Sequence, residues 1–159
     1  MAREPWYRRA ARGALAGAGA TVAMSTVQFP GALAVGRFPP PVEITRRLQQ
    51  VRGRRPDRHR LFARAAALHL AFGAGCGALY AVVAPRRFRE LSAIAFAGVI
   101  YEGSYRASLP ALRLHPHTAD DHTSRQVSNV AGHLIYGLTL AELLRLTDPH
   151  DDQTEDHEV

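Results

Sequence analysis

The stretch GALAGAGATVAMSTVQFPGALAVG, from Gly13 to Gly36, decides the fold. It contains 24 residues without a charged side chain and is bounded by Arg12 and Arg37. At about 1.5 Å of rise per residue, a helix of this length exceeds a hydrocarbon core of about 30 Å. The stretch has no polar stripe at helical spacing, whereas a surface helix of a soluble protein would have one. It therefore predicts a helix that crosses a membrane.

Three more apolar runs follow along the chain. Residues 65–85 carry no formal charge, and residues 91–112 and 126–146 each include a few charged side chains. Helices of the latter kind insert when their polar groups face partner helices. We therefore predict the all-α class, as a polytopic membrane four-helix bundle whose helices cover about 13–36, 63–85, 90–112 and 126–146.

Two competing interpretations of this pattern stay open. The basic start, the first apolar run and the tripeptide Ala18-Gly19-Ala20 also resemble a signal peptide. The run is, however, longer than the roughly 7 to 15 residues of a signal core. The other interpretation is a soluble helical bundle, against which the missing polar stripe in the first two runs argues.

Polar segments flank and separate the apolar runs. We predict a basic N-terminal segment over residues 1–12, an Arg-rich loop over residues 37–62 and an acidic, disordered tail over residues 148–159. All 20 basic residues are arginines, and the formal net charge is +6. Because no aromatic residue is interleaved with the arginines of residues 52–60, we predict anionic headgroups of membrane lipids, and not nucleic acid, as the partner of the loop. Residues 41–51 could instead form an amphipathic helix that lies on the headgroups.

A self-match divides the chain into two halves. A motif of the form acid-x-Thr-x-Arg occurs over residues 43–47 and again over residues 121–125. A second motif, His-Leu-x-aromatic-Gly, follows over residues 69–73 and again over residues 133–137. The same order in both halves predicts a duplication into two helical hairpins of the same orientation. The repeated loop motif supplies the candidate residues Glu43, Thr45, Arg47, Asp121, Thr123 and Arg125.

The apolar runs contain a few polar side chains that are costly to place in a membrane and are therefore functional candidates. His69 and His133 occupy equivalent positions of the repeat, and Tyr136 is the aromatic residue of its second copy. The two imidazoles either bond to groups on neighbouring helices or bind a haem or a metal between two helices. Glu102 and Arg106 are four residues apart and are predicted to pair on one helix face. We expect the two histidines and Glu102 to organise the interior of the bundle.

Other chemical signals are weak. His115, His117 and His122 lie close together in a loop and could ligate a transition metal, but Pro116 makes local chelation awkward, and we predict no metal site there. Cys76 has no second cysteine with which to pair. The chain contains no P-loop, no His-Glu-x-x-His and no Gly-x-Ser-x-Gly pattern. We therefore predict no enzymatic activity and no cofactor.

Several segments resemble one family of membrane proteins. Besides the first apolar run, they are PPPVEITRRL (39–48), HLAFGAGCGALY (69–80), YEGSY (101–105), LPAL (109–112) and HLIYG (133–137). Over residues 10–147 the chain is similar to the YagU-like group of small bacterial inner-membrane proteins, whose function is unknown. The resemblance implies a multi-pass membrane protein and no established activity. Glu102 stands where such relatives often have an aromatic residue.

These observations lead to one functional hypothesis and one alternative. We expect an integral, multi-pass protein of the cell inner (plasma) membrane that is not an enzyme and that acts in transport, in lipid interaction or as a membrane scaffold. The expected partners are lipids and, in a homo-oligomer, further copies of the chain. The alternative is a haem- or metal-binding membrane redox protein that uses His69 and His133 as ligands.

Overall fold

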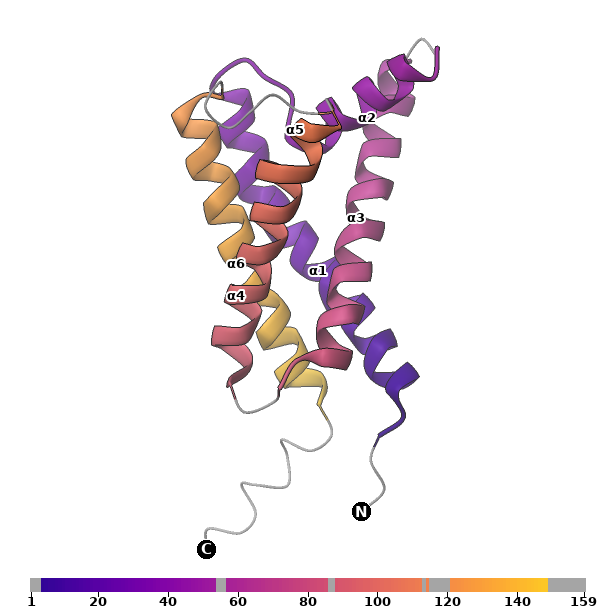
Figure 1. The fold of residues 1–159 in the computed structure, drawn as a ribbon, viewed down its shortest axis with the longest axis vertical. Coiled ribbons are helices and arrows are strands. Elements are labelled where there is room, and N and C mark those ends of the chain that lie inside the picture. The colour runs from indigo at the N-terminus through magenta and orange to yellow at the C-terminus, as the bar shows by residue number, and fades with distance from the viewer. Residues whose placement is uncertain (1–3, 54–56, 86–87, 113, 115–120, 149–159) are drawn as a thin grey trace, which may run out of the picture.

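The computed structural model describes residues 4–53, 57–85, 88–112, 114 and 121–148, and every regular element in these ranges is a helix (Figure 1). The elements are α1 (Trp6–Leu33), α2 (Pro40–Val51), α3 (Arg58–Val83), α4 (Arg89–Ile100), the π-helix η2 (Tyr101–Ser108), α5 (Leu109–Ala111) and α6 (Thr123–Thr147). The elements α4, η2 and α5 follow one another without a break and form one helical rod. The predicted all-α class is therefore confirmed.

The helix boundaries differ from the prediction mainly near the N-terminus. The helix α1 begins at Trp6, so most of the basic segment predicted over residues 1–12 is the first turns of this helix. The other three predicted helices lie largely within α3, the α4–η2–α5 rod and α6. Of the predicted acidic tail, the structure describes Asp148, which is buried rather than disordered, and residues 149–159 lie outside the described ranges.

The prediction of a loop over residues 37–62 is wrong, because most of that range is helical. It contains α2 and the first residues of α3. Pro40 and Pro41 start α2, at positions where a missing N–H leaves no helical hydrogen bond unmade. Asp57 caps α3 by accepting a hydrogen bond from the backbone nitrogen of His59 at 3.2 Å. The helix considered as the alternative for residues 41–51 is present as α2.

The long helical segments run in alternating directions (Figure 1). The helix α1 packs against both α3 and α6, α4 packs against α6, and α2 packs on α3. Figure 1 also shows that α1 and α3 cross, so that these two helices lie apart at the end at which α2 lies.

Paired glycines allow α1 and α3 to cross in direct backbone contact. A methyl group added at Gly13 or Gly77 would overlap the carbonyl oxygen of the other residue, and one added at Gly17 would overlap that of Gly73. Small residues four apart permit this approach between helices, which favours association where lipid supplies no hydrophobic drive. Gly75 lies on the same helix but faces open space. Gly73 and Gly77 of α3 therefore form the close crossing with α1, and Gly75 does not.

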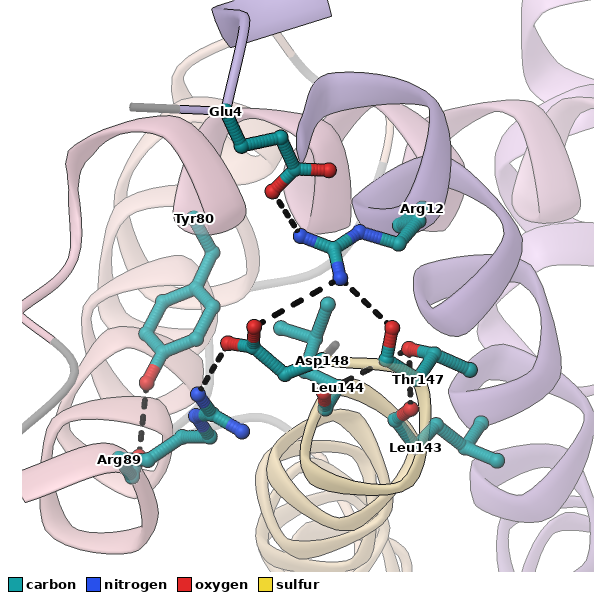
Figure 2. A network of polar contacts seen from close by, with 8 residues as sticks. All are labelled: Glu4, Arg12, Tyr80, Arg89, Leu143, Leu144, Thr147 and Asp148. Atoms are coloured by element: carbon teal, nitrogen blue, oxygen red, sulfur yellow. Dashed lines mark hydrogen bonds and ion pairs between the residues drawn. The ribbon is translucent and has the colours of Figure 1, made fainter. Parts of the chain in front are cut away.

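A polar cluster closes the end of the molecule at which α1 begins and α6 ends (Figure 2). The carboxylate of Asp148 accepts a hydrogen bond from Arg89 at 2.7 Å and lies 3.8 Å from a guanidinium nitrogen of Arg12. Arg12 also donates to the carbonyl oxygen of Thr147 at 2.6 Å, and Tyr80 donates to the carbonyl oxygen of Arg89 at 2.7 Å. Residues of α1, α3, α4 and α6 are thereby linked at this end, so the long segments are fixed relative to one another.

Two of the described helices, α3 and α6, are long and apolar enough to cross a membrane by length and composition. The helix α1 is longer still, but its glycine, serine, threonine and glutamine residues lower its mean hydropathy. The helix α4 has 12 residues because the rod continues as the π-helix. Two of the four predicted membrane helices thus meet the length and composition that a crossing requires.

Candidate functional site

A cavity of about 470 Å³ is lined by residues of α3 and of η2, among others. Its lining comes from α1, α2, α3, η2, α5 and α6, so it is formed by nearly every element of the fold. The lining is mostly apolar, and no aspartate, glutamate, lysine or arginine occurs among the described residues that form it. A volume of this size falls within the range of roughly 300–1,000 Å³ that is typical of small-molecule sites.

Both histidines of the repeated motif line this cavity, His69 from α3 and His133 from α6. His133 is oriented by a 2.8 Å hydrogen bond between its Nδ1 and the carbonyl oxygen of Asn129 and by an edge contact with the ring of Tyr101. The Nε2 atom of His69 is buried and has no hydrogen-bond partner among the described residues. The structure therefore brings the two predicted imidazoles into one site and leaves one of their nitrogens available.

Asn129 also lines the cavity, and sequence reasoning missed it. Its side chain is 1% exposed, and no hydrogen bond of normal geometry reaches either atom of its amide, although the hydroxyl of Tyr105 lies near it. An amide inside an apolar run, four residues before His133, is a signal that could have identified it. A buried polar group without a strong partner is costly to a fold, so Asn129 requires an explanation.

A buried ion cluster lies beside the cavity, at the start of α6. Arg125 is fully buried, donates to Glu43 of α2 at 2.7 Å and lies 3.5 Å from Asp121. Glu43 lies 3.7 Å from Arg47 as well, and Tyr105 donates a hydrogen bond to Asp121. The charges of this cluster therefore compensate one another within the protein.

The acid-x-Thr-x-Arg motifs thus contribute to one shared cluster rather than to two equivalent loop sites. Glu43, Thr45 and Arg47 lie within the helix α2, and the second copy lies at the start of α6. Thr45 donates to the backbone carbonyl oxygen of Pro41 at 2.7 Å, whereas Thr123 is exposed. The description of the motif as a repeated loop element is corrected accordingly, because the first copy is helical. Its Glu43 pairs with Arg125 of the second copy, 82 residues away.

The remaining candidates from the apolar runs do not belong to the lining of the cavity. Tyr136 donates to the carbonyl oxygen of Gly73 at 2.8 Å and so joins α6 to the glycine crossing. Glu102 and Arg106 form the predicted pair, with both carboxylate oxygens 2.9 Å from one guanidinium nitrogen. Both side chains are more than half exposed, so the expectation that Glu102 belongs to the interior of the bundle is wrong. The π-helix that carries the pair directs it outward.

The predicted histidine loop is described only in part. His115 and His117 lie outside the described residues, and His122 is an exposed residue directly before α6. Within the described ranges, no group of three or more histidine, cysteine, aspartate or glutamate side chains is arranged to hold a metal ion.

No protein-family model, no curated protein and no solved structure matches this chain. The resemblance to the YagU-like group therefore stays a prediction from the quoted segments, and the site rests on its own geometry.

Proposed function

We propose that this chain is a multi-pass protein of the cell inner membrane, with α1, α3, the α4–η2–α5 rod and α6 each crossing the bilayer. In this proposal the protein is not an enzyme, and it acts by binding or moving a lipophilic molecule. The Arg-rich end of α2 and α3 would contact anionic headgroups, which contribute about 1 kcal/mol per arginine near the surface.

The observation that carries the proposal is the distribution of large and small apolar residues. Large apolar side chains face outward on all four segments, among them Leu15, Val22, Leu79, Val99, Leu134 and Leu138. The buried positions of α1 are instead glycine, alanine, threonine, glutamine and methionine. A soluble bundle buries its large apolar residues and exposes a polar face. A bundle in lipid has small residues between its helices and large apolar residues on its surface.

The helix α3 supports the same placement. Only 17% of its apolar window is buried inside the protein, so most of this helix would present hydrocarbon to water in a soluble protein. Contiguous apolar surface of that extent marks an interaction with a membrane or a partner. Because the apolar surface extends around the other long segments as well, a membrane accounts for it better than a single partner does.

Cysteine labelling tests the number of crossings. The sole cysteine is Cys76, so a Cys76→Ser background allows single cysteines to replace the exposed residues Tyr7, Arg52, Phe88 and Leu112. We expect a membrane-impermeant maleimide to label positions 7 and 88 from one side of inverted and right-side-out vesicles, and positions 52 and 112 from the other.

A cysteine in place of Leu134 is the control, since it should be labelled from neither side. Release of the protein by alkaline carbonate, or labelling of positions 7 and 88 from opposite sides, would contradict the proposal. The same pattern assigns which end of the bundle is cytoplasmic.

The haem- or metal-binding function is the second candidate, and the shared cavity of His69 and His133 favours it. Two imidazoles from two helices are a common way of holding haem iron. If the cavity holds haem, protein extracted in mild detergent has a Soret band that both His69→Ala and His133→Ala remove, with Tyr136→Phe as a control outside the cavity. Protein without visible absorption and without bound metal would reject this candidate.

A further inference from the structure

We infer that the cavity between α3 and η2 binds an uncharged amphiphile, a molecule with a hydrocarbon chain and a head group that hydrogen-bonds through oxygen. The inference deepens the proposed membrane function and rests on it. Three observations support it: the absence of charge in the lining, the buried polar groups without strong partners, and the exposure of the apolar rim.

The lining excludes a charged head group. No formally charged side chain occurs among its described residues, and the nearest buried charges, Arg125, Glu43 and Asp121, already pair with one another. A phosphate or a carboxylate placed in this cavity would lose its water and gain no counter-ion, which is strongly unfavourable. A hydroxyl or a carbonyl oxygen carries no charge and therefore needs no counter-ion.

Two buried polar groups supply the hydrogen bonds that such a head group needs. The Nε2 atom of His69 and the amide of Asn129 line the same cavity, and no described residue satisfies them with a bond of normal geometry. An asparagine amide both donates and accepts, and a neutral imidazole nitrogen does one or the other according to its tautomer. A hydroxyl or carbonyl oxygen between the two would satisfy groups that the protein alone leaves without strong bonds.

The rim of the cavity favours access from the hydrocarbon phase. Leu68 and Phe72 belong to its lining and are each 53% exposed, on the face of α3 that the proposal places in lipid. On the side of the headgroups the cavity is covered by α2, from which Pro40, Pro41 and Ile44 contribute to the lining. An amphiphile can therefore reach His69 and Asn129 sideways from the bilayer.

A matched pair of probes tests the inference in phospholipid nanodiscs. The first is an octadecanol that carries a diazirine in its chain, and the second is the corresponding octadecyl phosphate, which differs only in its charged head. We expect the alcohol to crosslink to residues of the cavity lining at least five times more than the phosphate. Equal crosslinking by the two probes would overturn the inference.

Two variants connect the crosslink to the site. Asn129→Leu should lower crosslinking by the alcohol at least fivefold while leaving Tm unchanged or raising it by about 2–4 °C, because it removes a buried amide that has no strong partner. Ala71→Trp fills the mouth from an exposed position of the lining and should have the same effect on crosslinking. Leu79→Trp, on the exposed surface of the same helix but outside the lining, should crosslink like the unsubstituted chain.

The outcomes separate this inference from the proposed function. If the labelling pattern shows four crossings but the alcohol crosslinks equally in Ala71→Trp, the inference is wrong and the membrane proposal stands. If the chain fails the labelling test, both are wrong. A Soret band in the purified protein would assign the cavity to haem and would also overturn the inference.

Discussion

Substituting Gly77 by valine is expected to separate α1 from α3 and to have a large effect on stability. A side chain at this position would meet the carbonyl oxygen of Gly13 and the backbone of Gly17. Overpacking costs about 1–3 kcal/mol where side chains can adjust, and here the obstacle is main chain, which cannot rotate away. We therefore expect a loss at or above the upper end of that range, which lowers Tm by about 10 °C. Thermal melting followed by circular dichroism in mild detergent measures it.

The matched control is Gly75→Val, two residues earlier on the same helix. A side chain there meets nothing within 4 Å, so the change in helix propensity is the same and the packing change is absent. We expect this variant to melt close to the unsubstituted chain. Equal loss of Tm in both variants would show that propensity, and not the crossing at Gly13 and Gly17, explains the effect.

Replacing Arg125 by methionine is expected to be the most damaging single change to a charged residue. Arg125 is fully buried and holds α2 against α6 through its 2.7 Å bond to Glu43. Removing one partner of a buried pair leaves an uncompensated charge and typically costs about 3–5 kcal/mol. We expect a corresponding fall in Tm and increased proteolysis within α2, because that helix loses its bond to α6. Melting curves and limited proteolysis measure the two effects.

A double variant and a surface variant make this test specific. In Arg125→Met combined with Glu43→Gln, part of the lost stability should return, since the carboxylate that lost its 2.7 Å bond to Arg125 is replaced by a neutral amide. Arg60→Met breaks an exposed pair with Asp57 and should melt like the unsubstituted chain. If the double variant were as unstable as the sum of its single variants, the pairing of Arg125 with Glu43 would not be the source of the effect.

The helices could be predicted from the sequence because their signals are local. Long uncharged runs bounded by arginines mark the first two apolar helices, and mostly apolar runs mark the other two. Which glycines meet at the crossing of α1 and α3 is a tertiary property, because Gly75 has the same local surroundings in sequence as Gly73 and Gly77 but faces open space. For the region of α2 the sequence favours a loop, because arginine and proline dominate its surroundings, and leaves a helix over residues 41–51 as the alternative, since prolines at a helix start are compatible with it.

The candidate site was predictable only in part. His69 and His133 were found because a repeated motif marks them, and the cavity brings them together. The cavity itself depends on how α1, α2, α3, η2, α5 and α6 pack around it, which no local pattern specifies. The pairing of Glu43 with Arg125 joins two copies of a motif that the repeat treats as separate. Asn129 was overlooked because one amide in an apolar run is inconspicuous without knowledge of its neighbours.

The π-helix η2 has a consequence for how the chain tolerates insertions and deletions. Its wider turn holds an additional residue between α4, which packs on α6, and Tyr105, which bonds to Asp121. Each residue of an α-helix turns the chain by about 100°. Deleting one residue within η2 is therefore expected to leave an ordinary α-helix in which α4 and α5 keep their present directions. The π-helix therefore absorbs one residue of chain length while α4 stays packed on α6 and Tyr105 stays bonded to Asp121.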